Sequence, residues 1–108
     1  MLTDSSGNPL AGGSVVVTTL GQPSGQYAYV ALANPITLFP NTTYALLSQE
    51  ASPGDQWYDY SGTYIALSPD ASGAFGEWAW NTPPPLNGAV SGDNQSYGPV
   101  NLQYIRLR

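Results

Sequence analysis

The sequence predicts an all-β fold, and more narrowly a single β-sandwich of jelly-roll type with about eight short antiparallel strands. Three observations support this prediction. No stretch shows helical periodicity between caps. Glycine, proline and asparagine interrupt the chain at intervals of about 8–12 residues, and the segments between them are rich in β-branched and aromatic residues. A length of 108 residues fits one domain, covering residues 1–108, with a core of its own.

The first half of the chain supplies four of the expected strands, and residues 2–4 can end a further one. Residues 14–20 (SVVVTTL) are mostly β-branched, which favours an extended backbone. In residues 26–33 the side chains of Tyr27 and Tyr29 alternate with apolar ones, so both tyrosines face the same side of the strand. The expected strands are residues 14–20, 26–33, 36–39 and 43–49, and residues 2–4 can form the end of a strand. Turns are expected at 6–9, 12–13, 21–25, 34–35 and 40–41.

The second half continues the same pattern. Residues 56–60 and 63–67 are two strands joined by a hairpin or a bulged bend. Residues 75–80 form the next strand, and three consecutive prolines at 83–85 make a stiff connector that cannot be a central strand. Residues 87–91 can form a short strand, and residues 100–107 are the final expected strand.

The charged residues limit the partners of this chain. Seven carboxylates stand against two arginines, Arg106 and Arg108, and the net charge is −5. A surface of this sign lacks the basic footprint that nucleic acids, sulfated glycans and anionic membranes require, so we expect none of these as partners. No apolar run approaches the ~20 residues of a membrane span.

Histidine and cysteine are absent from the sequence. The chain therefore offers no disulfide, no thiolate nucleophile, no imidazole base and no zinc ligands of the usual kind. The low charge and the many Ser, Thr, Asn, Gln, Tyr, Gly and Pro residues are typical of bacterial extracellular modules. We expect a secreted, monomeric domain that is a piece of a longer protein.

Residues 54–64 (GDQWYDYSGTY) hold the densest group of aromatic and polar side chains. In an extended segment Trp57 and Asp59 share one face while Tyr58 and Tyr60 share the other, so both faces are aromatic and partly polar. Such a surface suits sugars, which have apolar ring faces and hydroxyl rims. The alternative is a buried tryptophan flanked by tyrosines at a sheet edge. The expected sugar-binding residues here are Gln56, Trp57, Tyr58, Tyr60 and Tyr64.

Trp78 and Trp80 form a second aromatic element, because side chains at i and i+2 share a strand face about 7 Å apart. Indoles at this spacing can stack on sugar rings, for about 1–3 kcal/mol each by analogy with base stacking. The prolines at 83–85 would hold the adjoining loop stiff, and Asn81 adds an amide that pairs with hydroxyl groups. In the alternative, one tryptophan fills the core and the other covers a loop.

Carboxylates suggest a metal site more than a catalytic one. Glu50, Asp55 and Asp59 gather in one loop and the strand that follows, and carboxylates with backbone carbonyls suit calcium, although the spacing is not that of an EF-hand. A glycosidase would need two of these residues, or one of them and Glu77, facing one cleft. No motif marks such a pair, so we expect no catalysis.

Several segments together resemble a known family. They are residues 29–38 (YVALANPITL), 41–44 (NTTY), 48–50 (SQE), 54–59 (GDQWYD) and 96–104 (SYGPVNLQY), and they resemble carbohydrate-binding module family 81. The resemblance implies a small β-sandwich module beside a cellulase catalytic domain in secreted bacterial proteins, largely of soil and metagenomic origin. It also implies binding of β-1,4-glucans, with tolerance for xyloglucan and for mixed or β-1,3 linkages. Within the matching segment 54–59, the resemblance points to Trp57 as a functional or framework aromatic residue.

The sequence therefore predicts a non-catalytic carbohydrate-binding module that recognises β-glucans and keeps an attached glycoside hydrolase near its substrate. The rival from another class is a structural or adhesive β-sandwich domain of a cell-surface protein, in which the tryptophans would be buried. A small glycosidase is the second rival.

Overall fold

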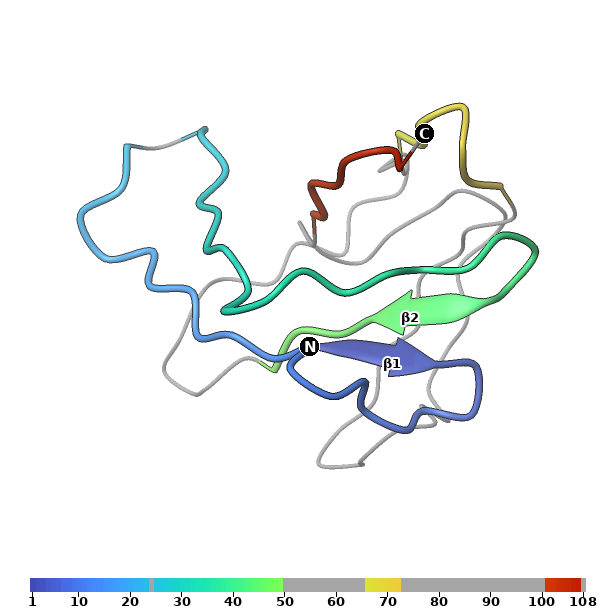
Figure 1. Ribbon diagram of the computed structural model, residues 1–108. Coiled ribbons are helices and arrows are strands. Elements are labelled where there is room, and N and C mark those ends of the chain that lie inside the picture. Colours follow the sequence, from blue (N-terminus) through green and yellow to red (C-terminus); the bar gives the residue numbers. More distant parts are fainter. Residues whose placement is uncertain (24, 50–65, 73–100, 108) are drawn as a thin grey trace, which may run out of the picture. The chain divides into compact units, whose positions relative to one another are not determined.

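The computed structural model describes residues 1–23, 25–49, 66–72 and 101–107 (Figure 1). The chain divides into two compact units, one made of Met1–Ser48 with Val100–Arg108 and the other of Gln49–Pro99. In the second unit the structure describes Gln49 and residues 66–72 alone. The architecture below is therefore that of the first unit. The single domain expected from the chain length stays a prediction.

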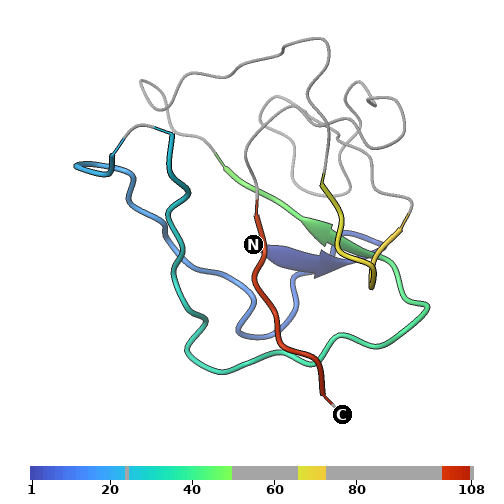
Figure 2. The same ribbon diagram turned by 90° about the horizontal axis from the view of Figure 1, so that it is seen from above.

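Two short strands, β1 (Leu2–Asp4) and β2 (Tyr44–Leu46), pair antiparallel. They lie side by side in both perpendicular views (Figure 1, Figure 2). Leu47 N–H donates a hydrogen bond to the Met1 carbonyl at 2.8 Å, and the Met1 nitrogen donates to the Leu47 carbonyl at 2.6 Å, so the pairing extends past the end of β2. The register is Leu2 opposite Leu46, Thr3 opposite Ala45 and Asp4 opposite Tyr44.

A tight turn follows β1. Gly7 N–H donates to the Asp4 carbonyl at 3.1 Å, and Asp4 N–H donates to the Asn8 carbonyl at 3.0 Å. Gly7 has φ 83°, the left-handed conformation that a three-residue hairpin loop requires at its last position. The Asp4 carboxylate also accepts from Ser6 N–H at 2.8 Å, the pattern of an Asx-turn. The turn predicted at residues 6–9 is confirmed.

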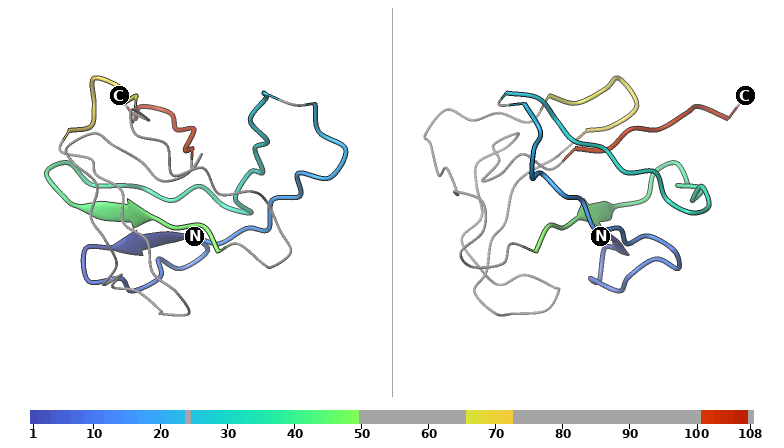
Figure 3. Two further views of the ribbon diagram at one scale, coloured as in Figure 1. Left: turned by 180° about the vertical axis from the view of Figure 1, so that it is seen from behind. Right: turned by 90° about the vertical axis from the view of Figure 1, so that its left-hand side faces the viewer.

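The chain then returns along the other edge of β1, so that β1 lies between this returning segment and β2 (Figure 3). Thr3 forms a bridge with Pro9, and Leu10 N–H donates to the Leu2 carbonyl at 3.0 Å. The bridge has its hydrogen bonds on the flanking residues, which is why proline, without an N–H, fits there. A two-stranded pair is marginal by itself, so the returning segment adds support to β1.

A second turn ends the returning segment. Gly13 N–H donates to the Leu10 carbonyl at 2.9 Å, and Gly12 between them has φ 74°, the sign that a type II turn requires at its third residue. Leu2 N–H then donates to the Gly13 carbonyl at 2.7 Å, which ties the end of the turn back to β1. The glycine turn predicted at residues 12–13 is confirmed.

The best-buried side chains of the described residues lie on β1. Leu2 is 5% exposed and Thr3 is fully buried, and neighbouring strand residues point to opposite faces. Both faces of β1 are therefore covered. The Thr3 hydroxyl donates to the Asp4 carbonyl at 3.1 Å, so its burial leaves no unpaired donor.

Other strand predictions fail within the described residues. Residues 14–20, 26–33, 36–39 and 101–107 contain no strand, and the strand predicted over 43–49 shortens to β2. Side-chain preference favours an extended backbone, but a strand also needs a hydrogen-bonded neighbour, which local sequence does not specify. The predictions for residues 56–60, 75–80 and 87–91 lie outside the described residues. Of the strand predicted at 63–67, residues 63–65 also lie outside them, and residues 66–67 contain no strand. The eight-stranded sandwich therefore stays a prediction.

Candidate functional site

The residues that the sequence marked for sugar and metal binding lie outside the described part of the chain. They are Gln56, Trp57, Tyr58, Tyr60, Tyr64, Trp78, Trp80 and Asn81 for sugar, and Glu50, Asp55 and Asp59 for calcium. Their roles stay predictions. The described residues offer a different aromatic site, built on the segment that begins at residue 25.

Tyr27 and Tyr29 form a ring pair. Their ring centroids are 6.4 Å apart, and the ring planes are inclined to each other by 53°. The distance lies in the range at which aromatic rings attract each other, and the inclination lies between stacked and edge-to-face arrangements. The prediction that both tyrosines face the same side is confirmed by this contact.

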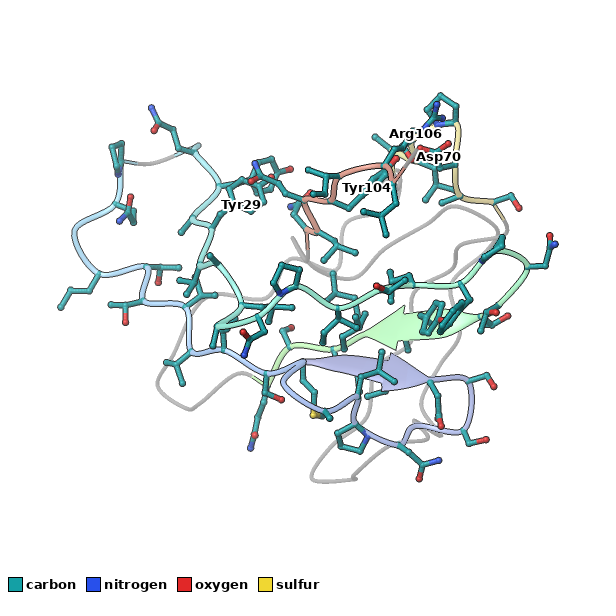
Figure 4. All side chains as sticks on the ribbon, in the orientation of Figure 1. Tyr29, Asp70, Tyr104 and Arg106 are labelled. Carbon is teal, nitrogen blue, oxygen red and sulfur yellow. The ribbon has the colours of Figure 1, made fainter. Side chains whose placement is uncertain are left out.

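Both rings lie open to solvent: Tyr27 is 62% exposed and Tyr29 is 46% exposed, whereas Ala28 between them is half-buried. The alternation follows from an extended backbone, in which side chains i and i+2 share a face. Figure 4 shows the side chains of this segment, with Tyr29 labelled. The pair therefore combines a defined mutual geometry with access from solvent.

Two glycine-dependent bends precede the tyrosine pair. Gln22 N–H donates to the Thr19 carbonyl at 3.0 Å, and Gly21 between them has φ 80°. Gly25 has φ 78° and directly precedes the extended segment that carries the rings. Both conformations are routine for glycine and costly for other residues. The turn predicted over residues 21–25 is thus confirmed at both of its glycines.

Residues 5–49 contain no charged side chain at all. The tyrosine pair lies inside this stretch, among residues whose polar groups are hydroxyls and amides, such as Gln22 and Gln26. Gln22 and Gln26 are exposed, as are both tyrosines. The segment can therefore offer ring faces and neutral hydrogen-bonding groups to a ligand, but no ionic contact of its own.

A third exposed aromatic ring lies at the next turn. Phe39 is 66% exposed, and its N–H donates to the Tyr44 hydroxyl at 3.0 Å. Asn41 in the same turn has φ 55°, and the Thr42 hydroxyl donates to the Pro40 carbonyl at 3.2 Å. The turn predicted at residues 40–41 is confirmed. In the described residues the ring contact is that of the two tyrosines, so Phe39 is an exposed ring without an aromatic partner there.

Asp4 is the carboxylate at the edge of the uncharged stretch, and the β1 turn occupies its oxygens. Asn8 donates to it twice, from Nδ2 to Oδ2 at 2.9 Å and from the backbone N–H to Oδ1 at 2.9 Å. These bonds, with that from Ser6, hold the pKa of the Asp4 carboxyl below its usual range. Asp4 stabilises the turn and stays ionised.

The described part of the chain contains no group of three or more His, Cys, Asp and Glu residues able to hold a metal ion. Nor does it contain a helix with the length and hydropathy needed to cross a membrane. Asp70 lies on residues 66–72, and Tyr104 and Arg106 lie on residues 101–107 (Figure 4).

Sequence reasoning noticed the alternation of Tyr27 and Tyr29 but did not select these residues as a site. The signal was present, because two aromatic residues at i and i+2 with small or apolar neighbours predict a shared face. The exposure of the two tyrosine side chains could not be read from the sequence, because it depends on how the chain packs. Comparison of the chain with known protein families, curated proteins and solved structures gave no match.

Proposed function

We propose that this protein is a non-catalytic carbohydrate-binding module that recognises β-glucans, including cello-oligosaccharides, xyloglucan and β-1,3-linked chains. It belongs to a secreted protein and keeps an attached glycoside hydrolase close to its substrate. Tethering of this kind raises the local substrate concentration without any new catalytic group.

The observation that carries the proposal is the chemical character of residues 5–49. This stretch has no charge, exposes the ring pair of Tyr27 and Tyr29 and is rich in hydroxyl and amide groups. A neutral glycan needs these features, because its ring faces stack on aromatic side chains and its hydroxyls pair with neutral donors and acceptors. The aromatic residues at 54–64 and 78–80 would extend the same chemistry.

The expected affinity is modest. Stacking contributes about 1–3 kcal/mol per ring by analogy with nucleic-acid bases. Three or four such contacts sum to about 3–12 kcal/mol, and the freedom that ligand and side chains lose on binding offsets part of that sum. A net of about 4–8 kcal/mol corresponds to dissociation constants between about 1 mM and 1 μM. An affinity in this range suits a module that must release and rebind as the attached enzyme consumes the polymer.

The test is titration with cellopentaose followed by tryptophan fluorescence, repeated after addition of EDTA. A saturable spectral change supports the proposal and places an indole near the sugar. Loss of the change in EDTA would support calcium at Glu50, Asp55 and Asp59, whose carboxylates suit that ion. No change, together with no retention on cellulose or xyloglucan, would refute β-glucan binding.

The rival function is a structural or adhesive domain of a cell-surface protein. One observation favours it: residues 14–20 expose apolar side chains, with Val16 88% and Leu20 90% accessible. Apolar side chains gathered on one segment suit contact with another protein. The same experiment separates the two functions, because an adhesive domain would show no saturable response to the oligosaccharide.

A further inference from the structure

We infer that Tyr27 and Tyr29 form a stacking subsite for a single neutral glucan chain, made of residues other than the tryptophans expected to bind sugar. The inference rests on the proposed function and adds to it the residues and the form of the ligand. The sequence assigned neither tyrosine to a site, and the proposed function does not say how either one meets the ligand.

The pair is pre-organised for binding. The centroids of the two rings are already 6.4 Å apart, a distance at which aromatic rings interact, so their orientations are coupled before a ligand arrives. Tyrosine has few side-chain torsions, and ordering them in the free protein lowers the entropic cost of binding. Each ring nevertheless keeps about half or more of its surface open. A tyrosine that served only the core would have lost that surface.

The inclination of the rings selects a single chain. Two rings inclined by 53° cannot both lie flat on one planar surface, so a crystalline cellulose face would stack on only one of them. A single chain can rotate about its glycosidic bonds and present successive sugar faces at different angles. The pair therefore fits a dissolved, twisted chain better than a crystal face.

The segment that carries the pair matches a neutral ligand. No charged residue occurs between Asp4 and Glu50, so the segment gives a charged ligand no attraction. The Tyr27 and Tyr29 hydroxyls both donate and accept hydrogen bonds, as sugar hydroxyls do, and the exposed Gln26 amide adds both kinds of group. Ring faces with polar edges are the complement of a pyranose ring.

The test uses the whole chain and four variants. Wild type, Tyr27→Ala, Tyr29→Ala, Tyr29→Phe and Phe39→Ala are titrated with cellohexaose by calorimetry. Each protein is also tested for retention in native gels containing hydroxyethyl cellulose and for pull-down on microcrystalline cellulose. Far-UV circular dichroism checks that every variant keeps the wild-type fold, which is expected because the altered side chains are exposed.

The expected result is that each tyrosine-to-alanine change weakens cellohexaose binding by at least about fivefold, the effect of losing one stacked ring. Tyr29→Phe keeps the ring and loses only the hydroxyl, so its affinity should fall between those of wild type and Tyr29→Ala. Phe39→Ala controls for loss of an exposed ring elsewhere and should bind as wild type. Soluble polymer should retain the wild-type protein more strongly than microcrystalline cellulose does.

Three results would overturn the inference. If wild type binds and both alanine variants bind equally well, the tyrosine subsite is wrong while the proposed function stands. If wild type prefers microcrystalline cellulose, the single-chain ligand is wrong. If wild type binds none of the glucans, the proposed function fails and the subsite fails with it.

Discussion

Gly13 lies where the returning segment meets β1, and a single added methyl group should loosen that junction. A Cβ on Gly13 would lie 3.0 Å from the Leu10 carbonyl oxygen, 3.2 Å from the Leu2 carbonyl oxygen and 3.3 Å from the Leu2 Cβ. Both oxygens already accept hydrogen bonds, from Gly13 N–H and Leu10 N–H. Neither atom is the end of a flexible side chain, so the backbone itself must move.

The size of the effect follows from two opposed contributions. Overpacking of this kind costs about 1–3 kcal/mol, whereas replacing glycine by alanine restricts the unfolded chain and stabilises by about 0.4–1 kcal/mol. The net expectation for Gly13→Ala is a loss of up to about 2.6 kcal/mol in the free energy of unfolding, with a central value of about 1.3 kcal/mol. For a domain of this size each kcal/mol lowers Tm by about 4–8 °C.

The assay is thermal unfolding followed by circular dichroism, with Gly12→Asn as the matched control one residue away. A Cβ on Gly12 meets nothing within 4 Å, and asparagine tolerates the left-handed conformation that φ 74° requires. The control should lose less stability than Gly13→Ala. A Tm for Gly13→Ala equal to or above that of wild type would refute the steric reasoning.

Three further predictions concern stability and binding. Leu2→Ala should lower the free energy of unfolding by about 2–5 kcal/mol, because Leu2 is 5% exposed, and urea denaturation measures the loss. Since hydrogen bonds lower the pKa of Asp4 in the folded protein, its contribution to stability is fully present above the ordinary aspartate pKa of about 3.9 and disappears as pH falls through the folded value. The Tm difference between wild type and Asp4→Asn should therefore shrink below about pH 4, and a constant difference would contradict this account. Raising NaCl from about 0.05 to 0.5 M should change the affinity for cellohexaose less than about twofold, because neither ligand nor residues 5–49 carry charge; a steep salt dependence in calorimetry would point to a charged site.

Local turn chemistry was the most predictable part of the fold. Gly7, Gly12, Gly21 and Asn41 all adopt the left-handed conformation within turns expected from the sequence. The strand at residues 2–4 was predicted as well, and β2 lies inside the strand predicted at 43–49. These features depend on conformational preferences of a few adjacent residues, which a single sequence expresses directly.

Pairing between distant segments was not predictable. Residues 14–20 have the β-branched composition of a strand, yet no strand forms there, while Thr3 bridges Pro9, a residue expected only in a turn. Which edges meet depends on the packing of the whole chain and not on local composition. For the binding site, the shared face of Tyr27 and Tyr29 followed from alternation, but their 53° inclination and their exposure did not.

The position of β1 has a consequence for how the chain can change in length. Its pairing with β2 joins Leu2 to Leu46 and so closes one long loop, whereas the turns on its other edge are local. The entropic cost of closing a flexible loop grows only with the logarithm of its length, and doubling the loop adds about 0.6 kcal/mol. Insertions between the turns at Gly13 and Asn41 would therefore leave the β1–β2 pairing nearly as stable, which makes this stretch the part of the first unit that can vary most while the strand pair persists.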